Sequence, residues 1–146
     1  MKAKNLKLIA NTFEDIGVIS AHLQDAIVSS EDIAHLIKSR IFLVQLNRFM
    51  WEDVEKGVFR KNKRIRTILK FDNVLKVISK NIKQNTKEFL DFLTIETIQL
   101  PDKSYEINLI FSGEAIIKIN CEVIEITLDD QGRPWESKTK PKHEFL

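Results

Sequence analysis

The chain of 146 residues is 43% hydrophobic and 30% charged, a balance that excludes disordered and fibrous proteins and fits one globular domain. Its single cysteine excludes an internal disulfide framework, and no apolar run is long enough for a signal peptide or a membrane span, so we expect a cytoplasmic protein. The net charge of +2 and the isoelectric point of about 8.6 fall short of the strongly basic range typical of a dedicated nucleic-acid binder.

A short strand at residues 6–10 and a helix at residues 13–26 are the first predicted elements. Asn11 and Thr12 supply polar caps ahead of the helix, and the acids that follow suit its first turn. Apolar residues then recur at spacings of three and four as far as Ile27, which is the period of a helix with one buried stripe. This is the only segment for which the sequence predicts a helix.

Residues 32–37 and 41–51 are predicted strands, because apolar and polar residues alternate and β-branched and aromatic residues are frequent. The short turn at residues 38–40 joins them into a hairpin. Residues 52–62 are polar, contain Gly57 and are predicted to form a surface loop.

A second hairpin is predicted from strands at residues 64–71 and 74–82, joined by a turn at Asp72 and Asn73. It lies in the segment 56–87, which holds eleven lysines and arginines and one acid, Asp72. Such uneven charge in a small domain predicts a dipolar surface.

Further strands are predicted at residues 89–100 and 105–111, and Ser112 and Gly113 then form a tight turn into a last strand beginning at Ala115. The apolar alternation slips by one at residues 123–124. A β-bulge, or a bend between sheet layers, would explain this slip within one long strand that ends at residues 129–134. The tail at residues 133–146 is expected to be loosely packed.

These elements predict an α+β fold, in which a mainly antiparallel sheet of about seven or eight hairpin-connected strands packs with one N-terminal helix near residues 13–26. We expect residues 1–146 to form a single domain. Weak internal sequence similarity leaves open a duplication of two sheet units, at about residues 1–55 and 64–130.

The basic segment supplies the first candidate functional surface. Its residues are Arg60, Lys61, Lys63, Arg64, Arg66 and Lys70, with the aromatic Phe59 inside the segment and Trp51 before it. Basic residues beside aromatic rings can bind phosphates and stack bases, but lysines also keep exposed strand edges from aggregating. Trp51 suits either a partner anchor or a cap on the open end of a sheet.

A second candidate is polar. His22 and Asp25 lie one helical turn apart, so the carboxylate could orient the imidazole for acid–base chemistry or simply form a surface ion pair with it. No nucleophile motif accompanies them, and no His or Cys pair has metal-ligand spacing. The sequence therefore predicts no catalytic residue, no metal and no cofactor. Cys121 alternates with apolar neighbours and is interpreted as a small buried residue.

Five segments of this chain resemble a small bacterial family known as domain of unknown function 2948. They are LKLIA at residues 6–10, ISAHLQDA at 19–26, NRF at 47–49 followed by WE at 51–52, LKFDNV at 69–74, and CEVIE at 121–125. The resemblance spans nearly the whole chain and implies a short, single-domain bacterial protein. It implies no activity, ligand or catalytic residue.

Three hypotheses follow. The first is a non-catalytic interaction module that binds another protein or a second copy of itself, through strand edges or charged faces. The second is an RNA- or ribosome-associated protein that uses residues 56–87. The third is an enzyme that uses His22 and Asp25.

Overall fold

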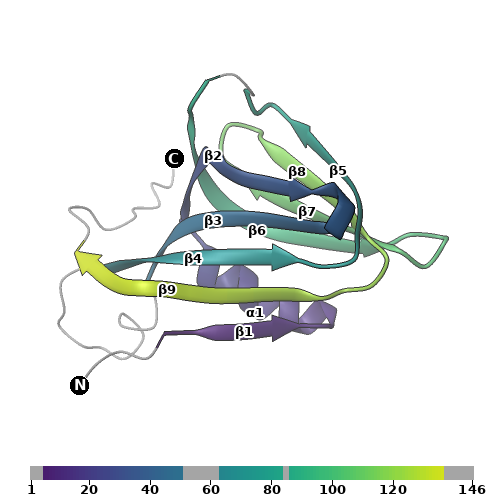
Figure 1. The fold of residues 1–146 in the computed structure, drawn as a ribbon, viewed down its shortest axis with the longest axis horizontal. Helices are drawn as coiled ribbons and strands as arrows, with labels where there is room; N and C mark the ends of the chain where they lie inside the picture. Colours follow the sequence, from purple (N-terminus) through teal and green to yellow (C-terminus); the bar gives the residue numbers. More distant parts are fainter. Residues whose placement is uncertain (1–4, 51–62, 84–85, 137–146) are drawn as a thin grey trace, which may run out of the picture.

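The computed structural model describes residues 5–50, 63–83 and 86–136 (Figure 1). Within these residues the chain forms one α-helix and nine strands, and the predicted α+β class with a mainly antiparallel sheet is confirmed. The elements are β1 (Lys7–Ala10), α1 (Phe13–Leu23), β2 (Ile27–Leu36), the 3-10 turn η1 (Ile37–Ser39), β3 (Ile41–Phe49), β4 (Lys63–Phe71), β5 (Val74–Lys80), β6 (Phe89–Gln99), β7 (Tyr105–Phe111), β8 (Ile116–Cys121) and β9 (Ile126–Glu136).

The nine strands form one sheet in the order β1-β9-β4-β3-β2-β6-β7-β8-β5, and every neighbouring pair is antiparallel. The sheet folds over at β2, which pairs with β3 at both of its ends but with β6 only at Ile27, Val28 and Ser29. A bulge in β2 between Val28 and Ile33 accompanies the fold. We call strands β1, β9, β4, β3 and β2 the first layer, and β6, β7, β8 and β5 the second layer.

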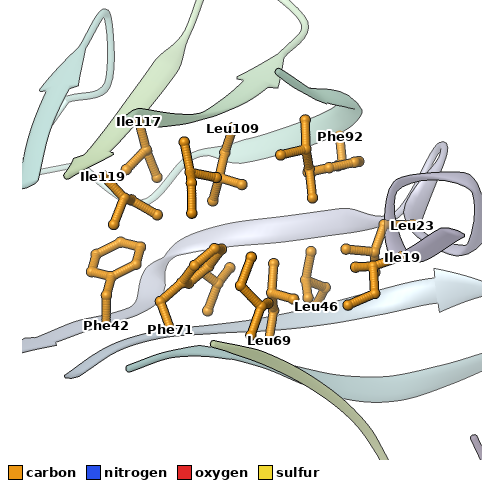
Figure 2. Packing of buried hydrophobic residues seen from close by; sticks show 14 of the residues in the cluster. Ile19, Leu23, Phe42, Leu46, Leu69, Phe71, Phe92, Leu109, Ile117 and Ile119 are labelled. Carbon is orange, nitrogen blue, oxygen red and sulfur yellow. The ribbon is translucent and has the colours of Figure 1, made fainter. Parts of the chain in front are cut away.

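The core lies between the two layers, where inward-facing residues of alternating strands meet. Figure 2 shows Phe42, Leu46, Leu69 and Phe71 of the first layer opposite Phe92, Leu109, Ile117 and Ile119 of the second, with Ile19 and Leu23 of α1 at one end. All ten side chains are buried. Burial of each large apolar side chain stabilises a fold by about 1.5–3 kcal/mol, so this cluster holds the layers together.

Helix α1 begins where its cap predicts and ends earlier than predicted. The Thr12 hydroxyl accepts a hydrogen bond from the Asp15 backbone N–H at 3.1 Å, which is the contact of an N-cap. The helix ends at Leu23 rather than residue 26, because Gln24 leaves the helical region with ψ 130° and Asp25 follows with φ +64°, in a turn closed by the Ala26 N–H donating to Leu23 O. Within the described residues, no helix has the length and apolar run needed to cross a membrane.

The first predicted hairpin is confirmed. Strands β2 and β3 pair around a turn in which Arg40 takes φ +58° and donates its backbone N–H to Ile37 O. Strand β2 begins at Ile27, before the predicted start at residue 32, because the polar Ser29, Ser30 and Glu31 hide the strand pattern around the bulge. The predicted loop at residues 52–62 lies outside the described residues.

The second predicted hairpin is wrong. Strand β4 pairs with β3 and β9 in the middle of the first layer, whereas β5 pairs with β8 at the end of the second layer. Asp72 and Asn73 do turn the chain, with Asn73 at φ +57°, but the turn passes from one layer to the other. Phe71 and Val74 are buried on either side of it, so the core is filled from both layers.

The prediction of a single last strand is also wrong. Strand β8 ends at Cys121 in the second layer and β9 starts at Ile126 in the first, so the slip in the apolar pattern marks a crossing between layers. Strand β9 then runs on to Glu136, past the predicted end, with Gly132 at φ +71° in an irregular stretch opposite β4. The tail beyond residue 136 lies outside the described residues, and the duplication of sheet units stays a prediction.

Candidate functional site

The basic segment does not form one surface among the described residues. Lys63, Arg64, Arg66 and Lys70 lie on β4 in the first layer, whereas Lys76 and Lys80 lie on β5 in the second. Trp51, Phe59, Arg60 and Lys61 lie outside the described residues. Because the segment is divided between two layers, its positive charges are divided between β4 and β5.

Two of the β4 cations are engaged within the protein. Arg64 is buried, and its Nη1 donates to the backbone oxygens of Asp25 and Asn47, each at 3.1 Å. Burial lowers the pKa of Arg64, although the nearby carboxylates of Asp25 and Asp91 act to raise it. Lys70 Nζ lies 3.6 Å from the Asp72 carboxylate. Arg66 is exposed on the same strand.

The polar candidate pair is separated by the end of the helix. His22 lies half-buried in the last turn of α1, and its Nδ1 is buried without a hydrogen-bond partner in the described structure. Asp25 lies beyond the helix end, where its backbone N–H donates to Phe92 O and its carbonyl accepts from Arg64. Neither residue lines either of the two pockets described below. No group of three potential metal ligands occurs among the described residues.

Arg48 and Asp130 form an ion pair that the sequence did not predict, at the inner face of the first layer. Both side chains are fully buried, and the guanidinium donates from Nε at 2.8 Å and from Nη2 at 2.7 Å to the two carboxylate oxygens. Thr67 Oγ1 donates to the same carboxylate at 2.7 Å, and the Leu6 backbone N–H donates at 2.8 Å. The pair joins β3, β4, β9 and the chain entering β1, so its position indicates a structural role.

Asp130 carries its charge despite burial. Burial by itself would raise the pKa of this carboxyl, but the hydrogen bonds from Arg48, the Leu6 N–H and Thr67 outweigh it and hold the pKa below 3.8. A carboxylate with four donors in place has no lone pair left for a substrate.

Cys121 is buried in the core, as the alternation predicted. Burial raises the pKa of its thiol to about 12, and the charge of Asp72 adds to the rise. We therefore expect the native protein to show no reaction with Ellman's reagent at pH 8, and one thiol to react after unfolding in guanidinium chloride. Rapid reaction of the native protein would contradict this burial.

Among the described residues, one edge of strand β5 pairs with no other strand. The Phe111 N–H donates to Ala115 O at 2.9 Å, and the alternation of an antiparallel ladder then directs the backbone groups of Ile117 and Ile119 towards β7. The residues between them on β8 direct their backbone N–H and C=O groups towards β5. There they lie opposite Lys76, Ile78 and Lys80. The backbone groups of Val77 and Ser79, which lie between, therefore point away from β8.

This edge faces the β2–β3 hairpin. At one end, the Val74 N–H donates to Arg40 O at 2.9 Å, just beyond η1. At the other end, Glu88 accepts from the Lys83 N–H through its carboxylate at 3.2 Å and exchanges backbone and side-chain hydrogen bonds with Ser30. Residues 33–36 of β2 pair only with β3. Within the described residues, the edges of β5 and β2 thus face each other without pairing, and hydrogen bonds connect the two sides at both ends.

A pocket of about 220 Å³ opens between these edges. Its lining residues come from β2, β3, β5, the turn after β5, and β8: Ser30, Ile33, Phe42, Val77, Ser79, Ile82, Lys83 and Ile117. Five of these eight are apolar, so the floor suits an aliphatic side chain. Sequence analysis did not locate this pocket, because which strand edge is free depends on which strands pair.

A second, shallower pocket of about 310 Å³ lies on the first layer where β9 is irregular. It is lined by Arg66, Gln131, Gly132, Arg133 and Trp135. Arg66 and Arg133 are exposed and form no ion pair in the described structure, and the Trp135 side chain is 40% exposed. Two cations beside an aromatic ring are suited to an anionic or stacking ligand.

Comparison with known proteins gives one match. A family model described as "Protein of unknown function (DUF2948)" matches residues 6–143. No curated protein matches the chain, and no solved structure does.

Proposed function

Since the chain belongs to the DUF2948 family, whose description assigns no function, we propose from the site itself that it is a non-catalytic module that binds an extended segment of another protein. The segment pairs with the free edge of β5 and adds a strand to the second layer. Strand addition is a common mode of peptide recognition, because backbone hydrogen bonds give affinity and pockets between them give selectivity.

One observation carries this proposal: the unpaired groups of Val77 and Ser79 border an apolar pocket. Exposed strand edges are normally shortened, covered or charged. The opposite edge of the sheet, β1, has four residues and contacts α1. Strand β5 has seven residues, no strand of the described residues pairs with its second edge, and a pocket lies between this edge and β2.

Pairing of β5 with a second copy of itself is disfavoured by charge. Lys76 and Lys80 are exposed and form no ion pair within the described residues. Two antiparallel β5 strands would place these lysines beside their counterparts, and like charges on adjacent strands destabilise a sheet. A different protein therefore fits the edge better than self-association.

Site-specific photo-crosslinking tests the proposal. Benzoylphenylalanine is placed at Ser79 in the full chain, and the matched control places it at Gln45 on the outer face of β3. We expect irradiation in the cell of origin to give a discrete adduct with another protein from position 79 only. An adduct of two copies of this chain would indicate self-association instead, and equal patterns from both positions would count against the proposal.

A second candidate function, binding of single-stranded nucleic acid, is favoured by the pocket of Arg66, Arg133 and Trp135. Arginines bind phosphates, and an exposed aromatic ring stacks on bases. This site includes one member of the basic segment, Arg66, and uses two residues outside it.

The second candidate predicts salt-sensitive binding of a fluorescein-labelled single-stranded RNA of 20 nucleotides. Each phosphate contact contributes a slope of about −0.7 in log K against log salt, so Arg133→Glu is expected to make the slope shallower by about one contact or more. Fluorescence anisotropy between 50 and 200 mM salt measures this. The control is Lys103→Glu, in the exposed turn between β6 and β7. Equal loss in both variants would indicate non-specific attraction.

A further inference from the structure

We infer that the segment bound at β5 alternates acidic and aliphatic residues. This inference rests on the proposed function and specifies its partner: a protein with an extended, acidic segment. The charge around β5, the faces of its side chains and the lining of the pocket each lead to it.

The charged side chains of strand β5 and the turn after it are all positive. Residues 74–83 contain Lys76, Lys80 and Lys83 and no acid, and all three lysines are exposed. None of them forms a salt bridge within the described residues. Lys118 on β8 lies opposite Ile78 and adds a fourth positive charge to the same end of the second layer. An acidic partner would relieve this repulsion and would be drawn to the edge over about a Debye length.

The lysines of β5 share one face. Lys76 and Lys80 pair with Asn120 and Ile116, which alternate with the buried Ile117 and Ile119, so they lie on the outer face of the second layer. A strand added to β5 places its own residues opposite these lysines at every second position. Opposite charges at such cross-strand positions stabilise a sheet. The outer positions of the incoming segment are therefore acidic.

The other face of the incoming segment meets the pocket. Val77 and Ser79 line it from β5, and Ile33, Phe42 and Ile117 line it from the remaining strands. A pocket of about 220 Å³ holds a branched aliphatic side chain. Burial of such a side chain in the pocket stabilises the complex. The inner positions are therefore Val, Ile or Leu, in alternation with the acids.

Selection from a random library of 12-residue displayed peptides tests the inference with the full-length protein. The target is the native chain, and each round is depleted on the Ser79→Pro variant, which blocks the edge. A second variant, Lys76→Glu with Lys80→Glu, reverses the charge and leaves the backbone groups of the edge unchanged. Circular dichroism verifies that each variant is folded, and if Ser79→Pro is not, the selection is carried out without depletion and the enriched peptides are compared on native and charge-reversed protein.

We expect the enriched peptides to alternate Asp or Glu with Val, Ile or Leu, and to bind the charge-reversed variant at least tenfold more weakly. Enriched peptides that bind native and charge-reversed protein equally would overturn the acidic partner while the proposed function stands. If no peptide distinguishes the native edge from either variant, the lysines only protect the edge, and both the inference and the proposed function are wrong.

Discussion

Replacement of Asp130 by alanine is expected to lower the free energy of unfolding by about 3–5 kcal/mol, which is the usual cost of leaving a buried charge without its partner. Arg48 remains fully buried in that variant, and it loses both hydrogen bonds to the carboxylate. The Thr67 hydroxyl and the Leu6 N–H lose their acceptor as well.

Urea unfolding at pH 7, followed by circular dichroism, measures this loss. The matched control is Asp129→Ala on the outer face of the same strand, where we expect a change within about 0.5 kcal/mol. The double variant Arg48→Met with Asp130→Leu is expected to lose less than Asp130→Ala, because no charge stays buried. Similar stability of Asp130→Ala and the native protein would contradict the buried pair.

The same carboxylate predicts how stability varies with pH. The pKa of Asp130 in the folded state is below its usual value of 3.8, so the folded state binds this proton less readily than the unfolded state. The stability that the group contributes is present above about pH 4 and is lost as the pH falls through the folded pKa. We expect unfolding free energies between pH 5 and 2 to fall more steeply for the native chain than for Asp130→Asn. Parallel curves would show that Asp130 is not responsible.

Replacement of Ser79 by proline is expected to weaken the binding of an edge-pairing peptide at least tenfold. Proline removes the N–H that points away from β8, and its ring obstructs the incoming strand. Each backbone hydrogen bond contributes about 0.5–1.5 kcal/mol net, and loss of one bond together with the clash accounts for the tenfold effect. The ladder to β8 uses the groups of Ile78 and Lys80, so we expect the free energy of unfolding to change by less than about 1 kcal/mol.

Isothermal titration calorimetry with a selected peptide measures this effect, and two controls separate edge pairing from side-chain contact. Ser79→Ala keeps the N–H and removes the hydroxyl that faces the pocket, so we expect affinity within about threefold of the native chain. Ile78→Pro breaks the ladder to β8 and is expected to be destabilised. Undiminished binding by a folded Ser79→Pro variant would exclude strand addition at β5.

The sequence by itself determined the local elements. The cap at Thr12, the helical period that follows and the alternation in β3 were each predicted from neighbouring residues, and the structure confirms them. The burial of Cys121 was predictable for the same reason, because residues of alternating phase share one face. The helix ended three residues early, at a backbone conformation that no local pattern marks.

The buried ion pair was within reach of the same reasoning. Arg48 lies on the same inward face of β3 as Phe42, Val44 and Leu46. Asp130 lies on the same inward face of β9 as Ile126 and Leu128. A charged residue in an inward phase requires a partner. The pattern could therefore have flagged each of them, but the contact between them required the sheet order.

Only the tertiary structure decided which strands pair beyond the local hairpins. Apolar and polar residues alternate equally well in β4 and β5, and a two-residue turn joins the two strands. Nevertheless, β4 lies in the middle of one layer and β5 at the edge of the other. The partner of β4, β9, follows it by more than fifty residues, and no local pattern carries that information. The free edge, its pocket and the separation of the basic residues all follow from this pairing, because a strand edge is open or closed according to its neighbours in the sheet.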